Sequence, residues 1–140
     1  MNVKCDTKEK FHVITVTEPA LTATMTAAME KCFFPYLENN AGQTNQPDEI
    51  INPQVKNLVL VLREVQSIDE TAARKLVHIQ QKFYESNVSF VICEMQKAVE
   101  EFLDEQALLE LMNVTPTESE AWDIVQMEEI ERELFSDDGN

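Results

Sequence analysis

The stretch from Asn57 to Leu76, NLVLVLREVQSIDETAARKL, decides the fold. Residues 58–62 are a continuous aliphatic run, which predicts a strand that is covered on both faces. Asp69 follows where a helix N-cap belongs, because its carboxylate can accept the free backbone N–H groups of a first helical turn. Glu70 adds a negative charge at the positive end of the helix dipole. The stretch therefore predicts a buried strand that turns into a helix.

The elements around this stretch follow from their own periodicities. The helix that Asp69 begins is predicted over about 70–86, since apolar residues recur there at steps of four, three and four: Ala72, Leu76, Ile79 and Phe83. Before it, the pattern predicts two short strands at 3–5 and 11–16, and then a helix from Leu21 to about Pro35. After it, the pattern predicts a strand at 88–93, a helix at 96–106, an apolar turn at 108–112, an edge strand at 115–116 and a last helix that Thr117 caps.

The apolar residues of the last helix are expected to form its buried side: Ala121, Ile124, Met127, Ile130, Leu134 and Phe135. The resulting order, β-β-α-β-α-β-α-(β)-α, predicts one α/β domain over residues 1–135. We expect a mixed, mostly parallel sheet of four to five strands packed against four to five helices. Residues 38–54 are predicted to be a long polar loop inserted in this domain, and residues 136–140 a frayed acidic tail.

The net charge of −15 is concentrated in the second half of the chain. Residues 1–93 carry 11 acids and 9 bases, whereas residues 94–140 carry 15 acids and 2 bases. Such a surface repels phosphate backbones and anionic lipids, so the charge predicts no nucleic-acid partner. A basic protein partner is one explanation of the acidic half, and solvated helix faces are the simpler one.

The composition also indicates a compartment. No run approaches the 18 apolar residues of a membrane span, and the opening residues MNVKCDTKEK do not resemble a signal peptide, so we expect no membrane insertion. The three cysteines are odd in number and far apart in the sequence. They are expected to be reduced thiols of a cytoplasmic protein.

No enzyme signature is present. His12 and His78 have no cysteine or acid at metal-ligand spacing, so no metal site is expected. Glycine occurs only at positions 42 and 139, which excludes a glycine-rich phosphate loop and a nucleophile elbow. Adjacent carboxylates such as those of Glu128 and Glu129 diverge on a helix and make poor acid/base pairs. We therefore predict a protein without catalytic activity or cofactor.

Residues 55–95, VKNLVLVLREVQSIDETAARKLVHIQQKFYESNVSFVICEM, resemble the centre of a STAS domain, the family of anti-sigma-factor antagonists and related modules. In that family a strand of the form "vvlDlsgv.fiDSSGl" leads into a helix and then another strand. Residues 19–22, PALT, take the place of the family's "GeLD", and residues 118–121 match its closing "eeAl". The resemblance covers about residues 3–125.

The resemblance implies a non-enzymatic module that binds a protein, such as a kinase-like anti-sigma factor. Many members are switched by phosphorylation of the residue after the motif aspartate, which here is Glu70. A phosphate adds nearly two charges at a helix N-terminus, and Glu70 offers about one. Glu70 is thus either a built-in phosphate mimic or, as we favour, an ordinary helix-start residue in a chain that lacks the switch.

Other positions depart from the family pattern as well. Val61 replaces an acidic residue of the strand, Glu64 replaces a small residue, and Ala72 and Ala73 replace Gly-Leu. Thr71 occupies the second hydroxyl position and is the one remaining candidate phosphoacceptor, although a hydroxyl bonded to the helix-start backbone is the simpler role. These departures weaken the case for a kinase-regulated antagonist, but they leave the docking surface intact.

Our leading hypothesis is a regulatory module that binds its partner through the turn and first residues of the helix: Ile68, Asp69, Glu70, Thr71, Ala72, Arg74 and Lys75. An accessory subunit that docks the ATPase of a membrane transporter is the first alternative. The second is a sensor of a small molecule or nucleotide beneath the 38–54 loop. Partner identity and self-pairing into a homodimer stay open.

Overall fold

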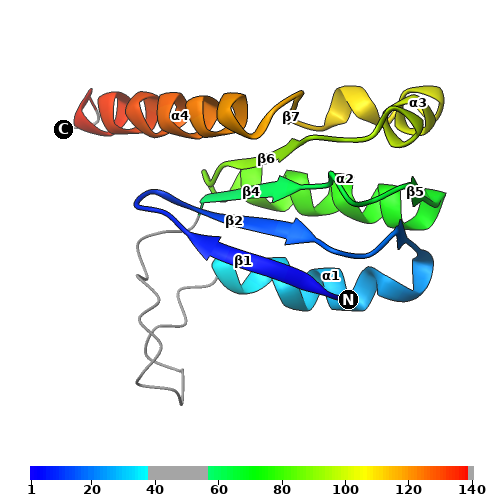
Figure 1. Cartoon of the computed structure of the whole chain (residues 1–140). Helices are drawn as coiled ribbons and strands as arrows, with labels where there is room; N and C mark the ends of the chain where they lie inside the picture. Colours follow the sequence, from blue (N-terminus) through cyan, green and yellow to red (C-terminus); the bar gives the residue numbers. More distant parts are fainter. Residues whose placement is uncertain (38–56, 139–140) are drawn as a thin grey trace, which may run out of the picture.

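The computed structural model describes residues 1–37 and 57–138, without the side chains of 135–138. These residues form a five-stranded sheet in the order β1-β2-β4-β6-β7 (Figure 1). Its strands are β1 (Val3–Thr7), β2 (Phe11–Val16), β4 (Asn57–Val61), β6 (Phe90–Cys93) and β7 (Val114–Thr115). The β1–β2 pair is antiparallel and the other three pairs are parallel. The predicted mixed, mostly parallel sheet is confirmed.

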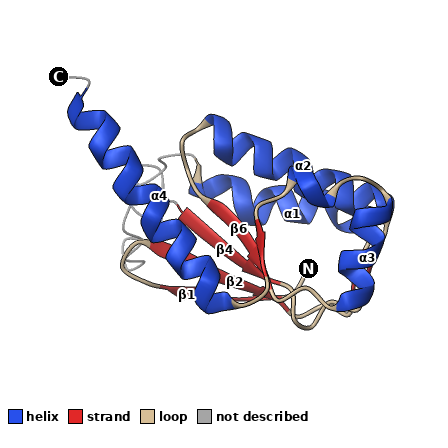
Figure 2. Ribbon diagram, turned by 90° about the horizontal axis from the view of Figure 1, so that it is seen from above, coloured by secondary structure: helices blue, strands red, loops and turns tan. Residues whose placement is uncertain are grey.

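Four α-helices surround the sheet in the described part of the chain: α1 (Thr26–Phe33), α2 (Glu70–Glu85), α3 (Lys97–Glu105) and α4 (Glu118–Asp138). α1 and α2 pack on one face, and α4 lies on the other (Figure 2). α3 packs beside the short strand β5 (Ser67–Ile68). The predicted helix count and the predicted single α/β fold are also confirmed.

Strand β4 shows why the stretch from Asn57 to Leu76 determines this arrangement of the helices around the sheet. All five of its residues are buried. Leu58 and Leu60 belong to the larger core beneath α1 and α2, whereas Val59 and Val61 belong to the smaller core beneath α4. Alternate side chains of a strand point to opposite faces, so a continuous aliphatic run serves two helix layers at once.

The entry to the first helix differs from the prediction. Leu21, expected to begin the helix, lies in a two-residue strand β3 (Ala20–Leu21), which pairs in parallel with β5. A 3₁₀ turn, η1 (Ala23–Met25), precedes α1, and a second one, η2 (Phe34–Tyr36), follows it. The sequence pattern did not predict β3 or β5, because two-residue strands are too short for an alternation to show. Their backbone partners, 47 residues apart in the sequence, form them.

The apolar side predicted for the last helix is wrong in large part. Ala121 and Val125 are buried, but Met127, Ile130 and Leu134 are more than half exposed. The helix has 21 residues and so spans about 31 Å, whereas the strands beneath it have four or five residues and span about 17 Å. Its C-terminal part extends beyond the sheet in Figure 2, and half-buried polar residues take the inner side there.

Three further predictions concern the C-terminal tail, the 38–54 loop and the apolar turn at 108–112. Residues 136–138, which we expected in a frayed tail, are the last turn of α4. They contain no helix-breaking residue, and glycine follows only at position 139. The predicted 38–54 loop lies outside the described residues. The predicted apolar turn at 108–112 is present as the 3₁₀ turn η3 (Leu109–Leu111).

Candidate functional site

The predicted docking surface lies at the carboxyl ends of the parallel strands, where loops of α/β folds present their functional groups. The chain leaves β4 at Val61, forms β5 and begins α2 at Glu70. The β3–β5 pair brings the turn η1 alongside the start of α2. The surface is therefore assembled from two segments of the chain, of which the sequence pattern predicted one.

Asp69 joins these two segments. Its side-chain oxygen Oδ1 accepts from the backbone N–H of Ala72 at 2.8 Å, which confirms the predicted N-cap of α2. Its other oxygen, Oδ2, accepts from the backbone N–H of Ala23 at 2.8 Å, and its own backbone N–H donates to the carbonyl of Leu21 at 3.0 Å. One carboxylate thus holds the starts of two helical segments. The second bond was not predictable from local spacing.

Glu70 lies exposed on the first turn of α2 and pairs with Arg74 one turn later. Two of the guanidinium nitrogens of Arg74, Nε and Nη2, lie 2.9 Å from the same carboxylate oxygen of Glu70. This is the i,i+4 arrangement that favours a helix. Both side chains are more than half exposed, so the pair adds little stability. Thr71, the candidate phosphoacceptor, is also exposed.

The remaining predicted site residues are buried or half-buried beneath the exposed ones. Ile68 and Ala72 are buried in the larger core. Lys75 donates to a carboxylate oxygen of Glu30 on α1 at 2.7 Å. That hydrogen bond, with the charge of Lys75, holds the pKa of Glu30 below its ordinary value. These residues position the exposed ones, which are Glu70, Thr71 and Arg74.

The structure adds exposed neighbours that the sequence analysis missed. Thr24 on η1 is exposed, and its hydroxyl lies 2.9 Å from that of Thr22. Gln66 and Ser67, which precede Ile68, are exposed too. The threonines carry no pattern that separates them from ordinary helix-start residues. Only their position beside Asp69 brings them to this surface.

Arg63 lies at the same end of the sheet, after β4, and pairs there with residues that follow β6 and begin α4. Its guanidinium pairs with Glu94 after β6 at 3.2 Å and with Glu118 at the start of α4 at 3.0 Å. Glu94 also accepts from the backbone N–H of Glu118. That hydrogen bond and the one from Arg63 hold the pKa of Glu94 below its ordinary value. The cluster ties β4, β6 and α4 together, so its charges are already paired.

The described residues offer no metal or nucleophile constellation. No three His, Cys, Asp or Glu side chains gather there as a metal site requires. Cys5, Cys32 and Cys93 are free thiols, as predicted. Cys93 is buried, and this burial raises its pKa to about 12, so its thiol is protonated at neutral pH. His78 is exposed, while His12 is buried, with its Nδ1 2.9 Å from the hydroxyl of Thr7.

A depression of about 490 Å³ lies between α2, β6 and α4. Gln80 on α2 is one of the lining residues. Its side chain donates to the carbonyl of Phe90 at 3.0 Å and accepts from the backbone N–H of Asn113 at 3.1 Å. Glu128 accepts from Ser89 and from Asn113. These polar groups thus bond to one another, and they do not converge on a ligand.

The family model of the STAS domain matches residues 3–121. The chain belongs to the STAS domain family. The match includes β1 through the first turn of α4, and therefore the whole surface around Asp69. No curated protein sequence matches the chain significantly.

Solved structures share this fold. TM1081 from Thermotoga maritima, a proposed anti-sigma factor antagonist, is 22% identical with a TM-score of 0.65, over 89% of this chain and 94% of that one. A serine-to-glutamate variant of RsbS from Moorella thermoacetica is 18% identical with a TM-score of 0.57, over 90% and 96%. The murine anion transporter Slc26a9 is 13% identical with a TM-score of 0.58, over 84% of this chain and 18% of the transporter. At these identities the similarities show the fold.

Among the helices of the described residues, none combines the length and the apolar character needed to cross a bilayer.

Proposed function

We propose that this STAS domain is a non-enzymatic regulatory module of the cytoplasm that docks a protein partner on the surface around Asp69. The observation that carries the proposal is the double role of the Asp69 carboxylate, which holds Ala72 and Ala23 together. A surface fixed in this way needs little ordering when a partner binds, and less ordering means less entropy lost. Glu70, Thr71 and Arg74 are its exposed contacts, and Ile68, Ala72 and Lys75 position them.

The pairing of Glu70 supports its role as a helix-start residue rather than a phosphate mimic. Its carboxylate is already partly neutralised by Arg74 of the same helix. A phosphate at this place would carry nearly two negative charges and would exceed what one arginine balances. We therefore infer that Glu70 is an ordinary helix-start residue and that the domain has no phosphorylation switch at position 70.

Thr71 is where a residual switch would act. Its side chain is exposed at the N-terminus of α2, where a phosphate would meet the helix dipole and the nearby Arg74. Treatment of the purified protein with a partner kinase and ATP, followed by mass spectrometry, tests this. We expect no stoichiometric phosphate on Thr71, and its appearance there would overturn the inference that the switch is lost.

The docking proposal is tested by a pull-down from native lysate with the wild-type domain and two charge-reversed variants. Glu70→Lys changes the proposed surface, and Glu105→Lys makes the same change on the exposed side of α3. We expect one partner to be retained by the wild type and by Glu105→Lys, and lost with Glu70→Lys. Equal retention by all three proteins would show that the start of α2 is not the docking site.

The identity of the captured partner separates the two regulatory hypotheses. A kinase-like anti-sigma factor would support partner switching. The similarity of this fold to that of TM1081, a proposed anti-sigma factor antagonist, favours this hypothesis. A transporter ATPase would support an accessory subunit instead. The sensor hypothesis depends on residues outside the described part of the chain. A thermal-shift screen with nucleotides and metabolites tests it, since a bound ligand raises the melting temperature.

A further inference from the structure

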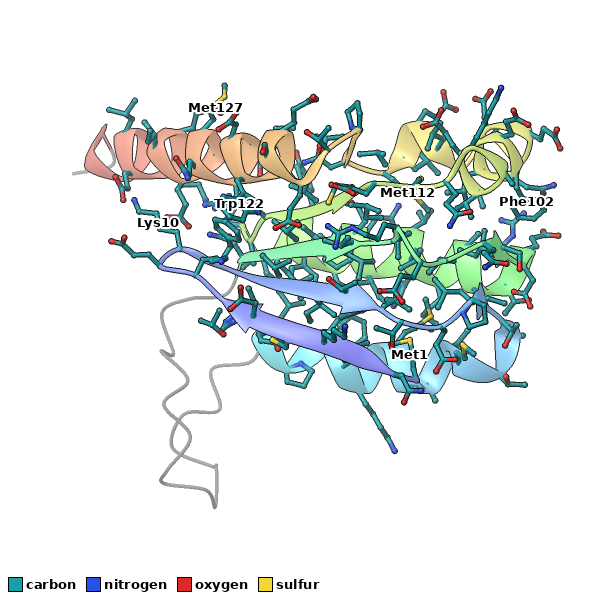
Figure 3. All side chains as sticks on the ribbon, in the orientation of Figure 1. Met1, Lys10, Phe102, Met112, Trp122 and Met127 are labelled. Atoms are coloured by element: carbon teal, nitrogen blue, oxygen red, sulfur yellow. The ribbon has the colours of Figure 1, made fainter. Side chains whose placement is uncertain are left out.

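The outer side of α4 carries an apolar stripe that no described residue covers. Met127, Ile130 and Leu134 are 58%, 53% and 60% exposed. Their spacing of three and four residues places them on one side of the helix. In Figure 3 Met127 points away from the sheet, whereas Trp122 on the same helix points toward the β1–β2 turn. We name Met127, Ile130 and Leu134 the outer stripe.

Exposed carboxylates flank the outer stripe. At 100° per residue, Glu120 and Glu131 lie along one side of it, Glu133 along the other, and Asp123 continues its line toward the helix start. All four side chains are exposed. The ion pairs among the described residues leave these four without a cation. The stripe is thus an apolar strip within a strongly negative surface.

The inner side of α4 explains how the helix stays in place while its outer side is bare. Arg132 donates to the side chains of Asn57, Ser89 and Glu129 at 3.1 Å each. Asn57 in turn donates to Glu129 at 2.6 Å and accepts from the backbone N–H of Ser89 at 2.9 Å. Burial alone raises the pKa of Glu129, but the hydrogen bonds from Asn57 and Arg132 outweigh it and hold the pKa below its ordinary value. Polar contacts on its inner side therefore hold this part of α4 to the sheet, and the outer stripe takes no part in them.

A hollow continues the stripe toward the β1–β2 turn. It measures about 310 Å³ and is lined by Lys8, Phe11, Trp122, Gln126 and Ile130, among others. The ammonium group of Lys8 lies 5.2 Å from the centre of the Trp122 ring and so covers one side of it. Glu9 and Lys10 complete the lining, so the hollow is mixed in character, with Phe11, Trp122 and Ile130 as its apolar part. Ile130 belongs to both the hollow and the stripe, so the stripe leads there into a space that can receive a large side chain.

We propose that the outer stripe is a second docking site, for a partner segment that forms a basic amphipathic helix. Apolar side chains at helical spacing would pack on Met127, Ile130 and Leu134, with Ile130 leading into the hollow, and flanking lysines or arginines would face the carboxylates. The charges argue against the other occupants. A second copy would place carboxylate against carboxylate, and an anionic lipid surface would be repelled in the same way.

The probe is a fluorescein-labelled 18-residue peptide with leucines at helical spacing and lysines beside them, titrated with the protein at physiological salt. We expect saturable binding that weakens at least about tenfold in Ile130→Ser/Leu134→Ser, a loss of about 1.4 kcal/mol. Leu111→Ser, at a site 49% exposed outside α4, is the matched apolar control and should change the affinity less than about twofold. A peptide with serine in place of leucine should bind more weakly by a similar factor.

A second pair of variants separates a specific site from general attraction to an acidic protein. Glu131→Gln/Glu133→Gln removes two charges beside the stripe, and Glu101→Gln/Glu105→Gln removes two from α3. We expect only the first pair to weaken binding. Equal weakening by both pairs, or binding unaffected by the stripe variants, would overturn the proposal. It would equally be overturned if analytical ultracentrifugation showed a wild-type dimer that Ile130→Ser/Leu134→Ser abolished.

Discussion

The start of α2 and the outer side of α4 are both exposed helical surfaces, but they are held in opposite ways. At the start of α2, exposed polar side chains sit directly above buried ones, and the Asp69 carboxylate ties the turn to a second segment. On the C-terminal half of α4, the apolar residues Met127, Ile130 and Leu134 face outward. The inner contacts there are polar, because Glu129 and Arg132 bond to Asn57 of β4. A change at the first surface therefore reaches the core, whereas a change at the second does not.

This difference teaches that the apolar character of a helix side does not by itself indicate what that side packs against. The inner side of α2 combines an apolar stripe with burial in the larger core. α4 is buried only where the short strands extend beneath it. Three measurements test this difference between α2 and α4, and they are given in order of decreasing expected effect.

The same substitution on the two helices should give very different losses. Leu76→Ala on α2 removes a fully buried side chain, so we expect the free energy of unfolding to fall by about 2–5 kcal/mol. Leu134→Ala on α4 removes a side chain that is 60% exposed, and we expect a change below about 0.5 kcal/mol. Urea denaturation followed by circular dichroism measures both. A loss above about 2 kcal/mol for Leu134→Ala would mean that the outer stripe is covered in solution.

The caps of α2 and α4 should also differ in their contribution to stability, because Asp69 bonds to two segments of the chain and Thr117 bonds only within its own helix start. Asp69→Ala removes the carboxylate that accepts hydrogen bonds from the backbone N–H groups of Ala23 and Ala72, and we expect a loss of about 1.5–3 kcal/mol. Thr117→Ala removes one longer bond, from the N–H of Glu120 at 3.2 Å, and should cost about 1 kcal/mol. Equal losses in urea denaturation would indicate that the bond from Ala23 to Asp69 contributes nothing in solution.

The smallest effect is kinetic. Cys93 is buried in the core beneath α4 and its pKa is about 12, so iodoacetamide should modify exposed Cys5 in the native protein and leave Cys93 unmodified. Arg132→Met removes the donor that holds α4 to Asn57 and Ser89, and it should speed the modification of Cys93 by increasing opening of the helix. Mass spectrometry of timed samples measures this. Modification of Cys93 as fast as Cys5 in the wild type would contradict the packing of α4.

Most of the sheet and the presence of all four helices followed from the sequence, since their patterns are local. The aliphatic run at 58–62 is long enough to identify a strand buried on both faces, and β4 confirms it. Asp69 was identified as a cap from its place before an amphipathic stretch, and the bond to Ala72 confirms that too. The error on α4 arose because Met127, Ile130 and Leu134 have the same spacing as a buried stripe, while the length of the strands beneath them is no property of that segment.

For the candidate site, the sequence identified the segment around Asp69 but not its surroundings. Thr24 and the bond from Ala23 come from η1, about 45 residues earlier in the chain. The β3–β5 pair that brings η1 there consists of two residues on each strand, which is too short for any periodicity. Likewise, Arg63 meets Glu94 and Glu118 only because three elements converge at one end of the sheet.

The strand at 58–62 and the cap at Asp69 could be read from the sequence alone, because each depends on residues within a few positions of one another. The resemblance to STAS domains could be read there too, because it follows the order of such local segments along the chain. The tertiary structure alone decided which side of α4 faces water and that one carboxylate, on Asp69, holds two helix starts. Both depend on distances between segments far apart in the chain. Local periodicity carries no information about such distances, since they are set by how the layers pack.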